Sequence, residues 1–81
     1  MTEEVNKINY LQLGPNGSYV ASPNEAMNFL GVARAKLYEL IKNGEVESYR
    51  EGGARKITWP SIRALIQRRL AEETARRHRA R

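Results

Sequence analysis

Cysteine is absent from these 81 residues, histidine occurs once, and no apolar run is long. The lack of cysteine excludes a disulfide framework and a thiolate metal site. The single histidine, His78, lies among arginines without other metal ligands beside it, which is typical of a solvated residue. A membrane span needs about 20 apolar residues, and the first residues lack the basic-then-apolar pattern of a secretion signal. We therefore expect a cytoplasmic protein with no membrane segment.

Patterns that indicate catalysis are missing as well. The sequence contains no paired carboxylates, no Ser-His-Asp set and no HExxH spacing. Gly52-Gly53 is too short for a phosphate-binding loop, which also needs a lysine and a following helix. We expect a protein that is not an enzyme and that binds no metal, cofactor or small-molecule ligand.

Apolar residues and positive charge are what the sequence does contain. Hydrophobic residues make up 41% of the chain, which is enough for one small folded domain with a thin core. The net charge of +5 is unevenly spread: −2 over residues 1–33, +2 over 34–59 and +5 over 60–81. A positive second half suits a polyanionic partner, although a merely soluble surface would carry a similar charge.

The first 21 residues allow two interpretations. Residues 8–13 are rich in strand-forming side chains, residues 14–17 (Gly-Pro-Asn-Gly) predict a turn, and residues 18–21 predict a returning strand. A flexible arm would have a similar sequence. An N-terminal strand or hairpin and an arm therefore both stay open.

A short helix is predicted after Ser22. Ser22 and Glu25 have the spacing of a capping box, and Pro23 suits the first helical position. Gly31 ends this helix because glycine tolerates a positive φ.

A second helix follows from about residue 34 to residue 43. Leu37, Leu40 and Ile41 form its buried face, and Gly44 follows its end. Two short helices joined by the turn at residues 31–33 are the pattern of a helix-turn-helix motif.

The next segment predicts a β-hairpin and a third helix. Residues 45–50 and 55–59 are the two strands, and the glycine pair forms the tip. Thr58 is expected to cap the third helix, Trp59 to lie in the core, and the helix to fray after Ala71. The predicted fold is a small, mainly helical α+β domain of the winged helix-turn-helix type. We divide the chain into an N-terminal arm or strand (1–17), the domain itself (18–71) and a basic C-terminal tail (72–81).

The outward face of the second helix is the first candidate DNA-binding surface. Arginine and lysine in a major groove contact guanine edges or phosphates, and Ala35 has room for a thymine methyl. Glu39 has two roles open to it, accepting from a cytosine amine or pairing with Lys36 or Lys42. An ordinary solvated helix face is an equal alternative. The candidate residues are Arg34, Ala35, Lys36, Tyr38, Glu39 and Lys42.

Two further basic surfaces join this helix. In the wing, a glycine tip lets the backbone approach a phosphate, and arginine is favoured in a narrow minor groove. The wing candidates are Arg50, Gly53, Arg55 and Lys56. The tail residues Arg76, Arg77, Arg79 and Arg81 are candidates for nonspecific phosphate contacts. A solubility tail and a protein-binding tail remain equal alternatives.

These residues together are similar to a known family. The matching runs are Ser22-Pro23-Asn24-Glu25-Ala26, Leu30-Gly31-Val32-Ala33-Arg34, Leu37-Tyr38-Glu39-Leu40-Ile41-Lys42-Asn43-Gly44 and Tyr49-Arg50-Glu51-Gly52-Gly53-Ala54-Arg55-Lys56-Ile57. The set resembles the excisionase-like branch of the MerR-type winged helix-turn-helix proteins. The resemblance implies that the second helix enters the major groove and that Arg55 of the wing touches the minor groove. Ala33 departs from the family's usual serine or threonine cap, and Glu39 stands where the family often has a basic residue.

The resemblance also implies a function. Excisionases, or recombination directionality factors, bind adjacent sites in attachment DNA, bend the DNA and assist an integrase. We therefore expect double-stranded DNA, a site-specific recombinase and further copies of this chain as partners. A small transcription regulator on the same scaffold is the alternative, and a basic protein-interaction module is a third. The absence of a long dimerising coiled coil disfavours a ligand-sensing regulator.

Overall fold

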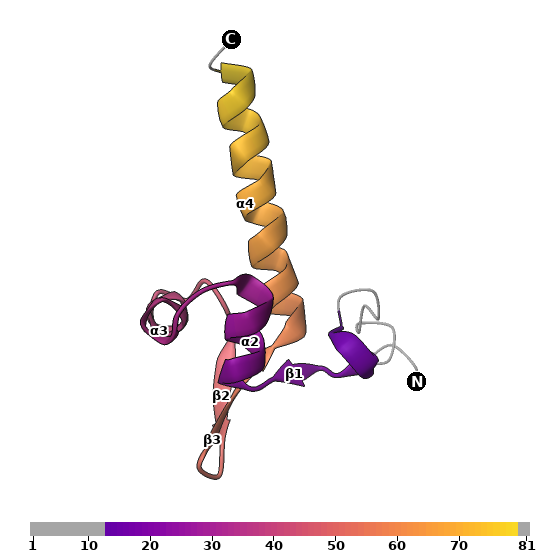
Figure 1. The fold of residues 1–81 in the computed structure, drawn as a ribbon, viewed down its shortest axis with the longest axis vertical. Coiled ribbons are helices and arrows are strands. Elements are labelled where there is room, and N and C mark those ends of the chain that lie inside the picture. Colours follow the sequence, from indigo (N-terminus) through magenta and orange to yellow (C-terminus); the bar gives the residue numbers. More distant parts are fainter. Residues whose placement is uncertain (1–12, 80–81) are drawn as a thin grey trace.

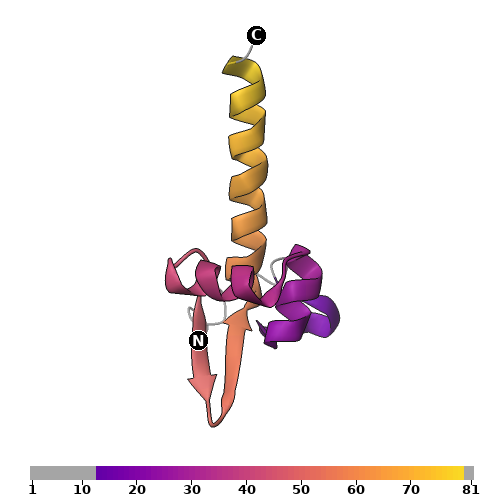
Figure 2. The same ribbon diagram turned by 60° about the vertical axis from the view of Figure 1, so that its left-hand side comes forward.

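A computed structural model describes residues 13–79 and shows a small three-stranded sheet, two short helices and one long helix (Figure 1). This arrangement confirms the predicted winged helix-turn-helix fold. The short helices pack at the base of the long one, and the hairpin extends on the opposite side from its free end (Figure 2). The elements are the 3-10 turn η2 (Pro15–Gly17), β1 (Val20–Ala21), α2 (Pro23–Leu30), α3 (Arg34–Lys42), β2 (Ser48–Glu51), β3 (Ala54–Thr58) and α4 (Trp59–Arg79).

The sheet is antiparallel, with strand order β1-β3-β2. The returning strand predicted over residues 18–21 is present only as Val20–Ala21. It pairs with β3, with Val20 opposite Thr58 and Ala21 opposite Ile57. The predicted partner strand over residues 8–13 falls outside the described residues except for Leu13, which lies in a bend. Strand β1 therefore adds a third strand to the two strands of the wing.

The start and end of α2 follow the predicted local signals. The Ser22 hydroxyl accepts from the Glu25 backbone N–H at 3.1 Å, and the Glu25 carboxylate accepts from the Ser22 N–H at 2.9 Å. Gly31 ends the helix with φ at 70°, a conformation that suits glycine. Because the capping box and the C-terminal glycine fix both ends, α2 is held at only eight residues.

The core lies where α2, α3, β3 and the first half of α4 meet. Leu37, Ile57 and Ile62 are fully buried and come from three different elements. The remaining buried apolar residues are Ala21, Ala26, Leu40, Val46, Trp59 and Leu65. Trp59 was predicted to be a core residue, and its exposure of 3% confirms this.

An aromatic cluster around Trp59 fixes the segment before β1. The Phe29 ring meets Trp59 edge-on at 4.9 Å, and the Arg63 guanidinium lies over both rings. Arg63 also donates from Nε to the Leu13 carbonyl at 2.9 Å. Gly14 lies so close to the indole that a Cβ atom built on it would be 2.2 Å from Trp59 Cε2. The chain before η2 is therefore held against α4.

The predicted cap by Thr58 is wrong. Thr58 still belongs to β3, and its hydroxyl is buried without a hydrogen-bond partner among the described residues. Ser61, in the first turn of α4, does not cap the helix either: its hydroxyl donates to the Thr58 carbonyl at 2.8 Å and accepts from the Glu47 N–H at 3.0 Å. The hydroxyl at the start of α4 therefore joins the helix to the chain entering the wing.

The long helix α4 continues to Arg79 for 21 residues, so the expected fraying after Ala71 is not observed. Ion pairs one turn apart stabilise its polar half: Arg69 with Glu72, and Glu73 with both Arg76 and Arg77. Within residues 13–79, no helix is long and apolar enough to cross a membrane.

Candidate nucleic-acid interface

The core positions of α3 decide which of its side chains face outward. Leu37 and Leu40 are buried against the other elements. Helical geometry then places Ala35, Glu39 and Lys42 on the opposite side, and all three are exposed. Tyr38 flanks them with 38% of its surface exposed. The outward face of α3 therefore presents the apolar, aromatic and charged groups that can meet a groove of DNA.

Two of the predicted α3 residues have partners within the protein. Arg34, the first residue of α3, donates to the side-chain oxygen of Asn24 in α2 at 3.1 Å. Lys36 forms an ion pair with Glu39 at 3.8 Å. Of the two roles considered for Glu39, this is the pairing with a neighbouring lysine. Lys36 also lies on the flank of α3 toward α4, where it lines an apolar groove with Leu40. The structure therefore separates Lys36 from the outward face.

The register of the wing divides its basic residues between two faces. Ser48 lies opposite Ile57 and Arg50 lies opposite Arg55. Because side chains alternate along a strand, Arg50 and Arg55 share the sheet face on which Ile57 enters the core. The Arg55 guanidinium donates to the Ser48 hydroxyl at 2.9 Å, a diagonal contact on that face.

Lys56 belongs to the other face of the wing, opposite Tyr49. The tip is formed by Gly52, with φ at 60°, and Gly53, and both glycines are exposed. Of the four predicted wing residues, the structure therefore brings Arg50 and Arg55 together beside Gly53 and sets Lys56 apart. Like charges directly opposite in a sheet destabilise it, so the Arg50–Arg55 pair gains from an anion between the two strands.

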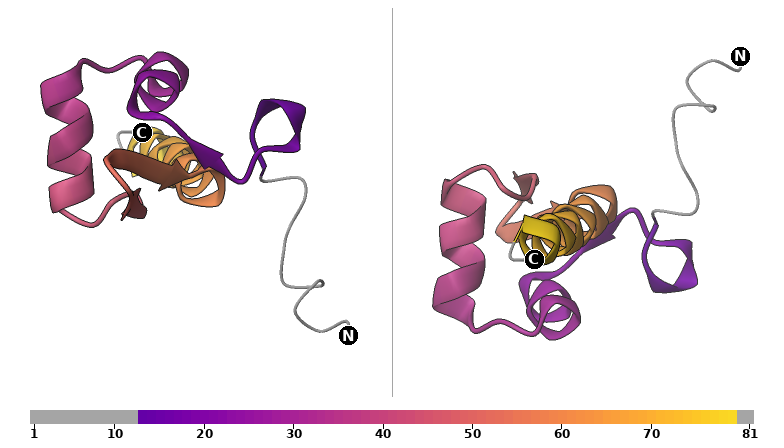
Figure 3. Two further views of the ribbon diagram at one scale, coloured as in Figure 1. Left: turned by 90° about the horizontal axis from the view of Figure 1, so that it is seen from below. Right: turned by 90° about the horizontal axis from the view of Figure 1, so that it is seen from above.

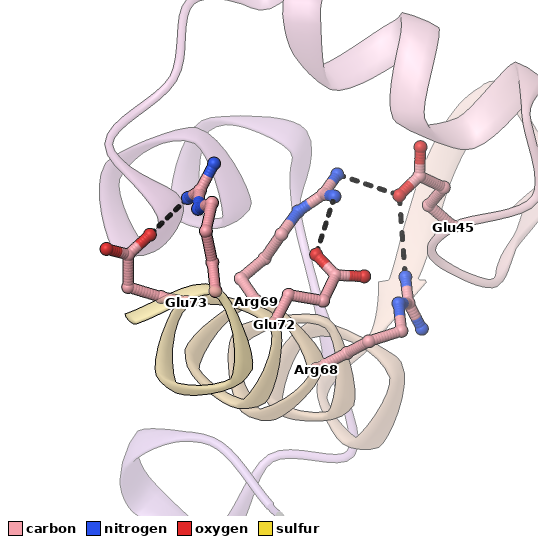
Figure 4. Close-up of polar contacts among 6 residues, drawn as sticks. Glu45, Arg68, Arg69, Glu72 and Glu73 are labelled. Carbon is pink, nitrogen blue, oxygen red and sulfur yellow. Dashed lines mark hydrogen bonds and ion pairs between the residues drawn. The ribbon is translucent and has the colours of Figure 1, made fainter. Parts of the chain in front are cut away.

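The basic residues of α4 form a third group, which is partly neutralised. Glu45, just after α3, accepts from Arg69 at 2.8 Å and from Arg68 at 3.4 Å (Figure 4). Farther along, Glu73 pairs with the predicted tail residues Arg76 and Arg77. Arg79 is the last residue of α4, and Arg81 lies outside the described residues.

Sequence reasoning missed three of these contacts. The Glu45 cluster joins residues more than twenty positions apart, and the Arg34–Asn24 bond crosses from one helix to the next. The bond from Arg63 to Leu13 spans fifty positions. Nothing in the local sequence pattern indicates any of them. Within residues 13–79, no group of three or more histidine, cysteine, aspartate or glutamate side chains could hold a metal ion.

The arrangement of α2, the turn at Gly31 and α3 is matched by a known family. A family profile described as a helix-turn-helix domain matches residues 22–70, which is more than half of the chain. The chain belongs to the helix-turn-helix domain family. In such domains the second helix lies in the major groove. The family assignment makes the chain a DNA-binding protein, and α3 is the second helix of its helix-turn-helix.

One curated relative adds a more specific likeness to this helix-turn-helix protein. It is described as a probable excisionase from Saccharopolyspora erythraea and is 39% identical over 51 residues. The match covers 63% of this chain but only 52% of the relative, so the chain spans about half of that protein's length. No solved structure gives a significant match.

Proposed function

We propose that this helix-turn-helix protein is an excisionase, an architectural DNA-binding protein that directs a recombinase toward excision of a mobile element. One observation carries the proposal. A single domain, which is similar to a probable excisionase, presents both α3 and the wing face that carries Arg50 and Arg55. In this proposal α3 enters the major groove and the wing tip enters the adjacent minor groove, as in the MerR-type branch. The protein itself contributes no chemical step.

Cooperative binding is part of the proposal. Bending a site of 20–30 base pairs costs on the order of 1–6 kcal/mol. One domain offers only a nine-residue recognition helix and one short wing. Several copies on adjacent direct repeats would share the cost of the bend. The distorted DNA would then allow an integrase to assemble an excisive complex.

A mobility-shift titration on the attachment region of the element that carries this gene tests the proposal, with a scrambled duplex as control. We expect a ladder of complexes on the attachment DNA and a log–log salt slope near −5 if about six phosphates are neutralised. Addition of the protein to an integrase reaction should then raise the yield of excised product. Equal affinity for both duplexes would contradict the proposal.

A transcription regulator on the same scaffold is the second candidate. The family match supports it equally, because the helix-turn-helix domain alone does not separate the two functions. Tight binding to a promoter, with no effect on integrase-dependent excision, would favour the regulator. Absence of salt-sensitive DNA binding would leave only a protein-interaction module.

A further inference from the structure

Arg55 on the wing is held in place by a hydrogen bond within the protein. Its guanidinium donates from Nη1 to the Ser48 hydroxyl at 2.9 Å, and both side chains are half-buried. Ser48 lies opposite Ile57, so it is two residues, or about 7 Å, nearer the base of the hairpin than Arg55 is. The Arg55 side chain therefore extends away from the glycine tip, toward the point where the chain arrives from α3.

The base of the wing adjoins α3 at this point. A shallow hollow of about 470 Å³ lies between them and is lined by Ile41, Val46, Glu47, Ser48, Tyr49 and Thr58. In the views of Figure 3, α3 lies on one side of the wing strands and η2 on the other. The two acidic residues among positions 47–58, Glu47 and Glu51, alternate to the sheet face opposite Arg55. The Arg55–Ser48 pair therefore lies at the edge of this hollow with no carboxylate of the wing on its own face.

A DNA strand has to pass between α3 and the wing if both of them contact the duplex. The placement proposed above puts α3 in the major groove and the wing tip in the adjacent minor groove, and a sugar-phosphate strand separates the two grooves. Its phosphates then lie beside Arg55 and Ser48. A guanidinium binds phosphate oxygens through charge-assisted hydrogen bonds. The Ser48 hydroxyl accepts from Arg55 and keeps its own hydrogen for a further acceptor.

Arg50 adds a second positive charge to this face, directly opposite Arg55. The Glu47 carbonyl accepts from the Thr58 N–H at 3.0 Å. The alternating ladder then makes Arg50–Arg55 one of the pairs without mutual backbone hydrogen bonds, whose side chains lie closest together. Repulsion between the two guanidinium groups is relieved by an anion. Arg50 is exposed, and within residues 13–79 it forms no bond to Ser48.

We propose that Arg55, positioned by Ser48, binds a backbone phosphate between the two grooves and does not enter the minor groove that the resemblance implies for it. Ser48 acts through Arg55 as a positioning residue. This inference rests on the proposed placement of α3 and the wing on DNA. Because a phosphate contact carries no sequence information, Arg55 contributes to the affinity for any duplex.

The two placements of Arg55 predict different effects of Ser48→Ala. If Arg55 binds a phosphate where it lies, loss of the hydroxyl frees the guanidinium and should weaken DNA binding about three- to tenfold, the scale of one hydrogen bond. If Arg55 reached into the minor groove, its bond to Ser48 would first have to break. Unchanged or tighter binding by Ser48→Ala would therefore overturn the proposal. Ser48→Thr keeps the hydroxyl and suits a strand, so it should restore most of the affinity.

A double-mutant cycle tests whether Ser48 acts through Arg55. In the Arg55→Ala background, Ser48→Ala should cause no further loss of affinity. Arg50→Ala is the matched control, because it removes the same charge from the same face without touching the bond to Ser48. In that background most of the Ser48→Ala loss should remain. A loss that persists without Arg55, or equal coupling to both arginines, would overturn the positioning role of Ser48.

The same cycle on a scrambled duplex separates this inference from the proposed function. A phosphate contact should give the same coupling between Ser48 and Arg55 on scrambled and attachment DNA. Equal coupling on both duplexes, together with equal affinity for them, would support the phosphate contact and contradict the excisionase proposal. Coupling on the attachment duplex alone would overturn the phosphate contact while the excisionase proposal stands.

Two chemical changes in the DNA then locate the contact. On a randomly ethylated attachment duplex, we expect at least one phosphate whose ethylation weakens the parent protein and not Arg55→Ala. The log–log salt slope of Arg55→Ala should be flatter by roughly 0.9. Replacement of adenine by 2,6-diaminopurine places an amino group in the minor groove and should weaken both proteins equally. A diaminopurine effect that disappears in Arg55→Ala, with no phosphate that depends on Arg55, would overturn the proposal.

Discussion

Gly14 is the residue at which the segment before β1 meets the core. Because a Cβ atom there would be 2.2 Å from the Trp59 ring, Gly14→Ala forces either the indole or the segment to move. We expect a loss of about 1–3 kcal/mol in the free energy of unfolding, measured by urea denaturation. Gly53→Ala is the control because its added methyl would meet nothing within 4 Å. Equal losses in the two variants would show that Gly14 does not need its small size.

Glu45 is the residue that joins the chain after α3 to α4. It pairs with both Arg68 and Arg69, and its own side chain is 29% exposed. Glu45→Gln should lower the free energy of unfolding by roughly 0.5–1 kcal/mol at low salt, the scale of partly exposed pairs. The loss should shrink at 1 M salt, where screening acts within about 3 Å.

The control for Glu45 is its neighbour Glu47, which is exposed and forms no ion pair within the described part of the chain. Glu47→Gln should leave stability nearly unchanged at both salt concentrations, as surface substitutions usually do. A salt-independent loss in Glu45→Gln would mean that the carboxylate acts through packing and not through charge.

At the scale of elements, the two helices of the helix-turn-helix differ in how they begin. Ser22 caps α2, whereas Ala33 at the corresponding position of α3 makes no side-chain cap. Ala33→Ser should therefore raise the free energy of unfolding by about 1 kcal/mol, and Ser22→Ala should lower it by about 1 kcal/mol. Thermal unfolding of the two variants beside the parent protein measures both changes. A destabilised Ala33→Ser variant would show that the backbone at Ala33 does not suit a capping serine.

The same helices show what the sequence can and cannot predict. The ends of α2 depend on Ser22, Glu25 and Gly31, whose signals act within four residues, and the structure confirms them. The end of α4 was predicted too early because its outer half has no apolar stripe to reveal its period. Its helix depends instead on charge pairs such as Arg77 with Glu73.

Contacts between distant segments explain the remaining differences. Strand β1 was recognised, but its partner was not, because strand formers do not specify which strand they pair with. For the candidate interface, helical spacing identified the exposed positions of α3. The separation of Lys36 from the outward face, and of Lys56 from Arg50, depends on how α4 packs and on the wing register.

At the scale of the whole molecule, the positive charge lies in two places. One is the domain that presents α3 and the wing, and the other is the helix α4, which extends away from both (Figure 2). The tail arginines of α4 lie beyond the last core residue, Leu65, and two of them pair with Glu73. We expect them to add electrostatic attraction to any duplex without sequence preference, because they lie away from α3 and the wing. The two groups should therefore make different contributions to DNA binding.

Removal of residues 76–81 should weaken binding to the preferred site and to scrambled DNA about equally. It should also flatten the log–log salt slope by roughly 0.9 for each phosphate that the tail no longer neutralises. Arg34→Ala and Lys42→Ala should instead lower the ratio of specific to nonspecific affinity, since each good base contact contributes about 1–3 kcal/mol of discrimination. Titrations of all three variants against both duplexes at two salt concentrations separate the effects. If the truncation abolished only the preference between duplexes, the reading of DNA sequence would lie in α4 and not in α3.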